Sequence, residues 1–265
     1  MSQFSTIIIS ERGPGVAQIS MARPAVFNAF DEVMIEELDE AFAIANQDSS
    51  VRVIVLTGEG KHFSAGADLQ WMKRASTATQ EWNLLDARKF ARMLYRIESS
   101  KKPTIARIQG VALGGGVGLT CACDIAIAAD NASFAVSEAK FGILPSVIGP
   151  YVTNSVGKKQ AKRLALTTTR ITAEEALRIN MIQQIVSLEI LDQAIDSTAS
   201  ELLSSGPKAI EEIKNLYAQL SMGPINEDVL ELTAQTISRV RGTDEAREGF
   251  DAFLNKRSPN WIPKV

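Results

Sequence analysis

The chain has 265 residues, of which 45% are hydrophobic and 22% are charged, so it can bury the core of one large domain or of a main domain with a smaller companion. Its formal net charge of −3 gives no general attraction to nucleic acid or to an anionic membrane, and neither is an expected partner. The N-terminus has no basic segment followed by a long apolar core, and no uncharged stretch is long enough to span a bilayer, so we expect a cytoplasmic protein.

The N-terminal segment predicts a hairpin followed by a helix. Runs rich in β-branched residues at 5–9 and 16–21 flank the turn Gly13-Pro14-Gly15. Apolar residues then recur at steps of three and four between Met34 and Ala45, which gives one apolar face of a helix. Asp31 stands where an N-cap residue is expected.

Strand and helix patterns alternate through the middle of the chain. A helical pattern at about 81–98 lies between the first two of four predicted strands, which are 51–57, 104–108, 124–129 and 133–136. Such alternation is typical of an α/β architecture.

Helical signals dominate the C-terminal part. Thr172-Ala-Glu-Glu175 is a capping box, and helical periodicity then covers four segments, near 189–204, 207–220, 226–240 and 243–256. We therefore predict a mixed core over 1–195 and a helical region over 196–265.

Two junctions between a strand and a helix are built from very small residues. Strand 51–57 leads into Ala65-Gly66-Ala67, and strand 104–108 leads into Gly114-Gly-Gly-Val-Gly118. Small residues let a ligand approach the main chain, and the first N–H groups of a helix have no internal acceptor, so two such amides could form an oxyanion hole. Tight packing of a helix against a sheet explains the same glycines equally well, and both interpretations stay open.

Residue types exclude several other chemistries. The dinucleotide fingerprint fails because Leu119 stands where its third glycine is needed. His62 is the only histidine, so neither a Ser-His-Asp triad nor a multi-histidine metal site is expected. Cys121 and Cys123 are too close for an ordinary disulfide and lack the CxxC spacing of a zinc site, which favours small buried side chains. No metal is predicted.

Glu138 is the carboxylate that stands out. It follows strand 133–136 in an otherwise apolar stretch, where partial desolvation would favour the neutral form and suit an acid or base near neutral pH. The alternative is a surface residue at the end of a strand.

Several motifs, taken together and in order, resemble those of the crotonase superfamily, the enoyl-CoA hydratase and isomerase family. The matching segments are RPAVFNAF at 23–30, VRVIVLTGEGKHFSAGADL at 51–69, KKPTIARIQGVALGGGVGLTCACDIAIAAD at 101–130, SEAKFGILP at 137–145 and EGFDAFLNKRSPNW at 248–261. The resemblance covers nearly the whole chain and implies an α/β fold, a ββα spiral core with a C-terminal helical trimerisation region. It also implies a homotrimer or a dimer of trimers.

The resemblance also implies the site. The amides of Ala67 and Gly115 would bind the carbonyl oxygen of an acyl-CoA thioester, and Glu138 would be the catalytic acid and base. No cofactor is implied, because coenzyme A is part of the substrate. The other implied substrate-binding residues are Ala29, Ala65, Asp68, Leu69, Gly114, Gly118, Lys140, Phe253 and Lys256.

The chain departs from the family pattern at two places. Many hydratases carry two glutamates; Glu138 matches the second, but Gly118 stands at the first, as in isomerases that shift a 3-ene to a 2-ene with one carboxylate. Where many members read Pro-Gly-x-Gly-Gly-Thr, this chain reads Pro145-Ser-Val-Ile-Gly-Pro150. Together with FSAGADLQWM, this segment resembles bacterial hydratases of 3-methylglutaconyl-CoA or isohexenylglutaconyl-CoA.

We therefore predict reversible addition of water across the 2,3-double bond of a branched enoyl-CoA. Gly118 would leave room for the second Cβ substituent, and Lys140 or an arginine would meet the distal carboxylate, unless Lys140 is simply exposed to solvent. The alternatives are the 3-ene to 2-ene isomerase and a catalytically silent scaffold that binds acyl-CoA or RNA.

Overall fold

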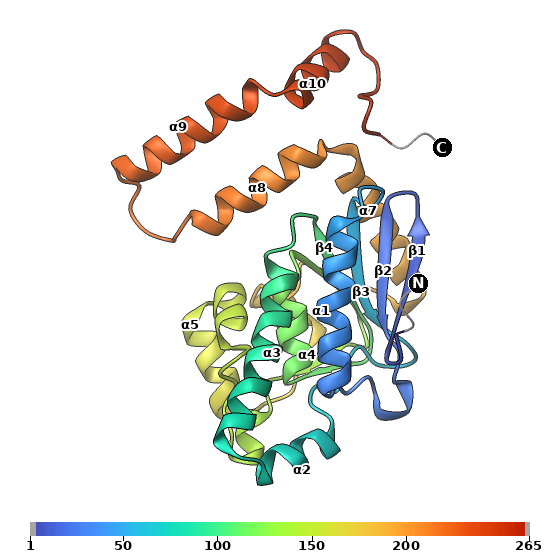
Figure 1. Cartoon of the computed structure of the whole chain (residues 1–265), viewed down its shortest axis with the longest axis vertical. Coiled ribbons are helices and arrows are strands. Elements are labelled where there is room, and N and C mark those ends of the chain that lie inside the picture. Colours follow the sequence, from blue (N-terminus) through green and yellow to red (C-terminus); the bar gives the residue numbers. More distant parts are fainter. Residues whose placement is uncertain (1–3, 263–265) are drawn as a thin grey trace.

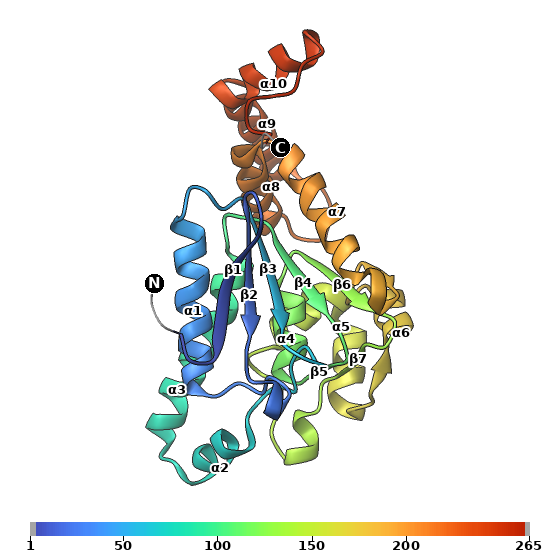
Figure 2. The same cartoon turned by 90° about the vertical axis from the view of Figure 1, so that its right-hand side faces the viewer.

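A six-stranded sheet runs through the body of the molecule (Figures 1 and 2). The computed structural model describes residues 4–262. In spatial order the strands are β1 (Ile7–Gly13), β2 (Val16–Met21), β3 (Val53–Gly58), β4 (Thr104–Ile108), β6 (Ile125–Ala129) and β9 (Gln184–Val186). The predicted hairpin is confirmed, since β1 and β2 are antiparallel, and the later neighbours in this sheet are parallel.

A second, smaller sheet lies beside the first. Its strands are β5 (Val111–Leu113), β7 (Ser133–Ala135) and β8 (Ile171–Thr172), of which β5 and β7 run parallel. The sequence pattern predicts β7 but not β5, β8 and β9, because strands of two or three residues are too short to show a periodicity.

Helices cover both faces of the large sheet. α1 (Glu32–Gln47), α3 (Gln80–Glu98) and α4 (Gly115–Ala122) pack on one face, and α7 (Leu191–Ser204) packs on the other. The strands alternate accordingly, so that along β3 Ile54 and Leu56 face the first group while Val53 and Val55 face α7. Asp31 caps α1 as predicted, because its side chain accepts a hydrogen bond from Met34 N at 3.1 Å.

Three further helices complete the core. These are α2 (Leu69–Thr77), α5 (Gly149–Thr167) and α6 (Ala173–Arg178). Thr172 caps α6 as predicted, because it accepts from the N–H of Glu175 at 3.4 Å, but the Glu175 side chain pairs with Arg163 and does not complete the capping box. Helix α5 was not predicted, because Gly157 at φ +76° interrupts its helical pattern. One-turn 3₁₀ helices lie at η1 (Pro24–Val26), η2 (Glu138–Phe141) and η3 (Leu188–Ile190).

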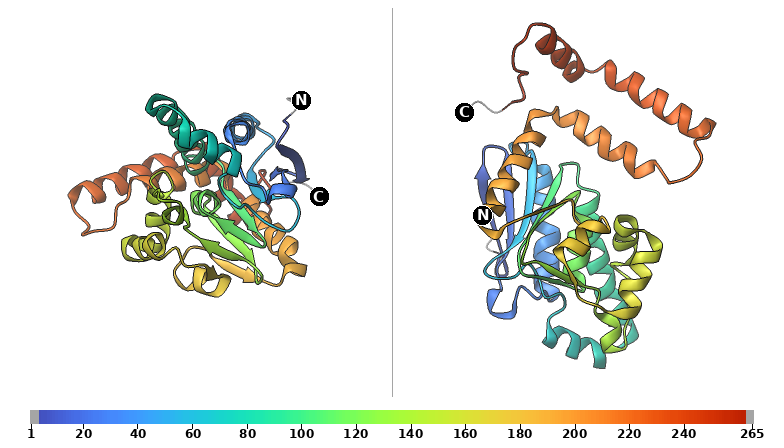
Figure 3. Two further views of the ribbon diagram at one scale, coloured as in Figure 1. Left: turned by 90° about the horizontal axis from the view of Figure 1, so that it is seen from below. Right: turned by 180° about the vertical axis from the view of Figure 1, so that it is seen from behind.

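The last helices extend away from the sheet (Figure 3). They are α8 (Pro207–Gln219), α9 (Glu227–Arg241) and α10 (Asp244–Leu254), close to their predicted limits. The proposed division of the chain at residue 195 stays a prediction and falls within α7, where Ile195 and Ala199 belong to the same buried cluster as the sheet. Over residues 4–262, no helix is both long enough and apolar enough to cross a membrane.

Candidate active site

A cavity of about 500 Å³ lies where the two small-residue junctions meet η1 and η2. The parallel strands of the large sheet run toward the end of the molecule that carries α2 (Figure 2), and ligands commonly bind at the carboxyl ends of such strands. Eight of the predicted site residues line this cavity: Ala29, Ala65, Ala67, Asp68, Leu69, Gly114, Gly115 and Glu138.

Main-chain pairing places the two junctions side by side. Ser64 N donates to Val111 O at 3.0 Å, and Leu113 N donates to Ser64 O at 2.9 Å. Gly66 has a φ of +84°, and a Cβ there would collide with Leu113 O and lie 3.3 Å from Gly115 N. The close approach of the junctions therefore requires glycine at position 66.

The N–H groups of Ala67 and Gly115 are available to a ligand. Gly115 is the first residue of α4, so its N–H has no acceptor within the helix. Neither N–H donates to another group within the part of the chain that the structure describes, and both residues line the cavity. Two free donors at one cavity are what the predicted oxyanion hole requires, and each such donor typically contributes about 3–4 kcal/mol to transition-state stabilisation.

Packing also explains the glycines of α4. A Cβ on Gly115 would collide with the Phe30 ring and lie 3.1 Å from Cζ of Phe90. A Cβ on Gly116 would lie only 2.6 Å from Ser64 O. The two interpretations of this glycine run therefore do not compete, because Gly115 both packs tightly and lines the cavity.

Glu138 is the carboxylate of the described cavity lining that is free to exchange a proton. Its Oε2 atom is buried and has no hydrogen-bond partner among residues 4–262. Burial raises the pKa of the Glu138 carboxyl above its ordinary value, although the main-chain N–H groups of Glu138 and Ser137 act in the opposite direction. The side chain is half-buried and begins η2, so it is not the exposed end of a strand. Such a carboxyl suits general acid and base catalysis.

Asp68 also lines the cavity, but its oxygens are occupied. It caps α2 by accepting from Gln70 N at 2.8 Å and Trp71 N at 3.2 Å, and it pairs with Arg23 at 3.0 Å. Burial alone would raise the pKa of the Asp68 carboxyl, yet the two N–H groups and Arg23 lower it overall. Asp68 therefore stays ionised and fixes the junction before α2.

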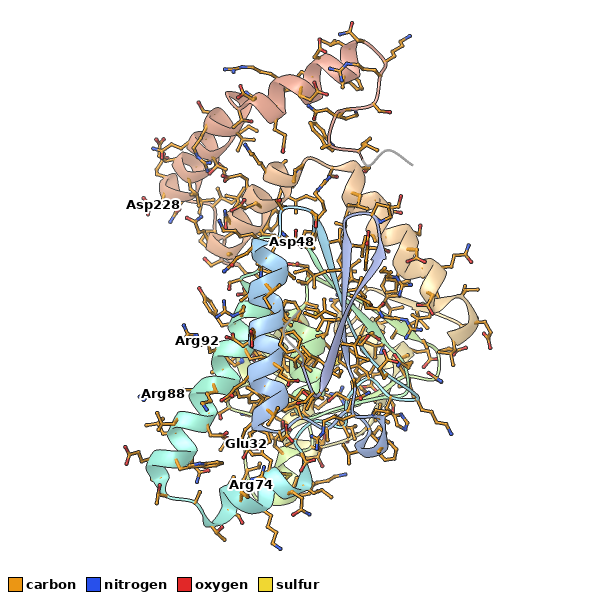
Figure 4. All side chains as sticks on the ribbon, turned by 45° about the vertical axis from the view of Figure 1, so that its right-hand side comes forward. Glu32, Asp48, Arg74, Arg88, Arg92 and Asp228 are labelled. Atoms are coloured by element: carbon orange, nitrogen blue, oxygen red, sulfur yellow. The ribbon has the colours of Figure 1, made fainter. Side chains whose placement is uncertain are left out.

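Side-chain contacts hold α2 beside the cavity. Arg74 Nη2 lies 2.6 Å from Oε2 of Glu32 at the start of α1 (Figure 4). The indole N–H of Trp71 donates to Asp86 on α3 at 3.2 Å. These contacts fix the wall that carries Leu69.

Gly118 does not line the cavity, and the space beside it is filled. A Cβ at this position would collide with the buried side chain of Ile148, whose own Cβ lies 3.0 Å away, and would lie 3.5 Å from Cδ1 of Leu94. The expectation that Gly118 leaves room for a second Cβ substituent is therefore wrong, because Ile148 occupies that room. Ile148 belongs to Pro145–Pro150, so the two departures from the family pattern contact each other.

Three other predicted substrate contacts lie outside the cavity lining. Lys140 shares η2 with Glu138, and its side chain is exposed. Phe253, which is 82% exposed, lies on α10 and Lys256 follows it, at the opposite end of the molecule from α2 (Figure 1). A single chain does not bring these two residues to the cavity. The described lining contains no lysine or arginine.

The single histidine and the two cysteines have structural surroundings. His62 Nδ1 accepts from Val111 N at 3.3 Å, and its ring packs edge-on against Phe27 with centroids 4.8 Å apart. Burial raises the pKa of Cys121 to about 12 and also raises that of Cys123, so neither thiol is a nucleophile near neutral pH. Within residues 4–262, no three His, Cys, Asp or Glu side chains gather in a way that could hold a metal ion.

The rest of the cavity lining was not predicted from the sequence. These residues are Val26, Phe27, Gln70, Met72, Leu113, Ser137, Phe141 and Ile143. Most lie in or beside the matching motifs, but no local pattern shows which apolar residue of a loop faces a cavity. Phe27, Phe141 and Ile143 are each more than half exposed and form an apolar rim.

Known proteins match almost the whole chain. Residues 11–264 match the family model described as enoyl-CoA hydratase/isomerase. A crotonyl-CoA hydratase from Syntrophomonas wolfei subsp. wolfei is 34% identical over 97% of this chain and 98% of its own. A 2,3-dehydroadipyl-CoA hydratase from Escherichia coli is 30% identical over 97% of this chain and 99% of its own.

Solved structures match equally well. An enoyl-CoA hydratase from Shewanella pealeana has a TM-score of 0.94 and 40% identity, covering 98% of this chain and 97% of its own. The predicted fold class, an α/β crotonase fold with a helical C-terminal region, is confirmed.

Proposed function

The chain belongs to the enoyl-CoA hydratase/isomerase family, and on that premise we propose that it is an enoyl-CoA hydratase. The observation that carries this proposal is the convergence of two free main-chain N–H groups and one half-buried, partly unpartnered carboxylate on a single cavity. Hydration of an enoyl thioester needs both, because the N–H groups stabilise the charge on the thioester oxygen and the carboxylate moves a proton.

The amides of Ala67 and Gly115 hold the thioester carbonyl oxygen in this proposal. They draw electron density toward that oxygen, which makes Cβ of the conjugated acyl group electrophilic. As the water oxygen bonds to Cβ, the electrons of the double bond move into an enolate, whose charge lies at the two N–H groups.

Glu138 moves the proton. Its carboxylate takes a proton from the water as the new C–O bond forms and then delivers that proton to Cα. One carboxylate suffices because the proton it accepts is the proton it gives, and delivery from one side chain favours addition of both parts of water to the same face.

Within this activity, we propose a branched acyl group that carries a distal carboxylate, as in 3-methylglutaconyl-CoA or isohexenylglutaconyl-CoA. The support is the resemblance of FSAGADLQWM and GILPSVIGPY to such hydratases. The 2,3-dehydroadipyl-CoA hydratase of Escherichia coli is named for a substrate that also carries a distal carboxylate. Lys140, two residues after Glu138 and exposed, is the cation that we propose for that group.

The test is a substrate panel. Purified protein is assayed with 3-methylglutaconyl-CoA, isohexenylglutaconyl-CoA, crotonyl-CoA and a 3-enoyl-CoA. The absorbance of the conjugated thioester is followed, because it falls on hydration and rises when a 3-ene is shifted to a 2-ene. We expect hydration of the conjugated substrates, with the highest kcat/KM for a glutaconyl substrate. We also expect Lys140→Met to lower kcat/KM for the glutaconyl substrates but not for crotonyl-CoA. Turnover of the 3-enoyl-CoA alone would contradict the hydratase proposal.

The second candidate is the 3-ene to 2-ene isomerase. Two observations favour it: Glu138 is the free carboxylate of the described lining, and Ile148 fills the space beside Gly118. An isomerase needs only one carboxylate, because it moves one proton along the chain and consumes no water. No turnover of any substrate in the panel would instead favour the catalytically silent scaffold.

A homotrimer or a dimer of trimers is also part of the proposal. The helices α8 to α10 expose large apolar side chains, namely Ile213, Tyr217, Leu230, Ile237, Phe250 and Phe253. Apolar surface of this extent on helices that project from the body is typical of a contact between subunits.

A further inference from the structure

The proposed hydration requires the attacking water to be held in one orientation, and Glu138 alone supplies one contact to it. The inference below rests on the proposed function. Helix α4 supplies no second contact, because Gly118 has no side chain and Ile148 fills the adjacent space. Asp68 supplies none either, since its oxygens are engaged by Arg23 and the start of α2.

Ser137 has a free hydroxyl at the cavity. It directly precedes Glu138 and lines the cavity with it. Its side chain does not cap η2 and has no hydrogen-bond partner among the residues that the structure describes. Its backbone, at φ −102° and ψ 1°, lies in the sparsely populated bridge region where many active-site residues are found.

Ser137 and Glu138 present oxygens to the same glycine. A Cβ built on Gly114 would stand 3.3 Å from Glu138 Oε1 and 3.8 Å from Ser137 Oγ. Gly114 has a φ of +51°, so no side chain at this position separates the two oxygens from its main chain. The two oxygens therefore lie on the same side of Gly114 in the lining of the cavity, next to Gly115, whose N–H belongs to the proposed oxyanion hole.

We propose that the Ser137 hydroxyl holds the water that attacks Cβ, in the role that a second carboxylate would otherwise have. Glu138 accepts a hydrogen bond from one hydrogen of the water and takes that proton as the C–O bond forms. Ser137 Oγ accepts a hydrogen bond from the other hydrogen, which stays on the new hydroxyl group. The proton on Glu138 then moves to Cα, so the oxygen and both hydrogens of the water end in the product.

The experiment compares two reactions of the full-length enzyme. The first is hydration of the best substrate in the panel. The second is exchange of the Cα protons of butyryl-CoA with D₂O, followed by NMR, which needs Glu138 and the two amides but no attacking water. We expect Ser137→Ala to lower kcat for hydration by about 100-fold and to leave the exchange rate at the wild-type level. Ser137→Thr, which keeps a hydroxyl, should retain most of the hydration activity.

Each other outcome contradicts the inference in a recognisable way. Unchanged hydration by Ser137→Ala would overturn the role of the hydroxyl. Equal loss of hydration and exchange would show that Ser137 acts by orienting Glu138 and not by holding water. A wild-type enzyme that exchanges the Cα protons but hydrates no substrate would contradict the proposed function itself, and the water-binding role with it.

Discussion

The burial that makes Glu138 a suitable acid and base also lowers the stability of the folded chain. Its carboxyl is half-buried, and its Oε2 atom lacks a hydrogen-bond partner within residues 4–262. Because burial raises its pKa above the ordinary value of 4.5, the folded chain binds a proton at this site more tightly than the unfolded chain does. The contribution of Glu138 to stability is therefore unfavourable above its raised pKa, and this penalty is lost as the pH falls through the raised pKa to below 4.5.

Replacing Glu138 by Gln should stabilise the protein near neutral pH. We expect a gain of about 1 kcal/mol, because a neutral amide costs less to bury than a charged carboxylate, and this corresponds to a rise in Tm of roughly 2–4 °C. The gain should shrink as the pH falls through the raised pKa and should be lost below pH 4.5, where the carboxyl is protonated in both states. Thermal unfolding of both proteins at neutral and acidic pH measures this, and a variant that is less stable at neutral pH would contradict the account.

The pH dependence of turnover should reflect the same carboxyl. Glu138 must be ionised to accept a proton from water, so kcat/KM for hydration should rise with pH through its raised pKa. We expect the acidic limb of the profile at a pH above the ordinary glutamate value of 4.5. An acidic limb at or below that value would show that burial does not raise the pKa of the group that carries the proton.

The sequence could predict much of the site at the level of single residues, because small residues at two junctions and a glutamate in an apolar stretch are local patterns. It could not predict that Ile148 fills the space beside Gly118, because that contact joins positions 30 residues apart and depends on how α5 packs on α4. The free hydroxyl of Ser137 could not be predicted either, because a sequence does not show whether a serine has a hydrogen-bond partner or faces a cavity.

Helix α4 is the element on which the site depends, and its glycines limit what can replace them. Gly118→Ala should destabilise the protein by about 1–3 kcal/mol, because the new methyl group overlaps Ile148. Ile148→Ala removes the colliding atoms, so the double variant should be more stable than the sum of the single effects implies.

The control for this pair is Gly149→Ala. A Cβ on Gly149 meets nothing within 4 Å, so this change should be nearly neutral. Urea unfolding of the three variants and the double variant measures the coupling. Strict additivity of Gly118→Ala and Ile148→Ala would show that the two positions do not share one space.

Among the elements, the long helices were predicted well because a core-facing stripe gives a clear period. The exceptions have physical causes. Gly157 breaks the pattern of α5, and β5, β8 and β9 are held by sheet pairing over only two or three residues. The period of α7 predicts a helix but not its packing on the sheet, which is made through Ile195 and Ala199.

At the scale of the whole molecule, the chain is incomplete as an acyl-CoA site if Phe253 and Lys256 bind coenzyme A. Both follow α9 at the end of the molecule opposite α2, so they could only reach the cavity of a neighbouring copy (Figures 1 and 2). The exposed apolar side chains of α8 to α10 give such a neighbour a surface to pack against.

Two measurements test this assembly. Sedimentation should give the mass of a trimer or of a dimer of trimers. Phe253→Ala/Lys256→Ala should raise KM, and mixing it with Glu138→Gln subunits under exchange conditions should restore activity beyond the sum of the two, because some mixed sites contain neither change. A fully active monomer would contradict both expectations.

The central claim is that Glu138 carries the proton in the hydration of an enoyl-CoA. The most direct test compares kcat for wild type and Glu138→Gln on the best substrate of the panel, with acyl-CoA binding measured on the same samples. The account predicts that kcat falls by about 10²–10⁴-fold while binding is retained, because the amides of Ala67 and Gly115 are untouched. Hydration by Glu138→Gln at the wild-type rate would contradict it.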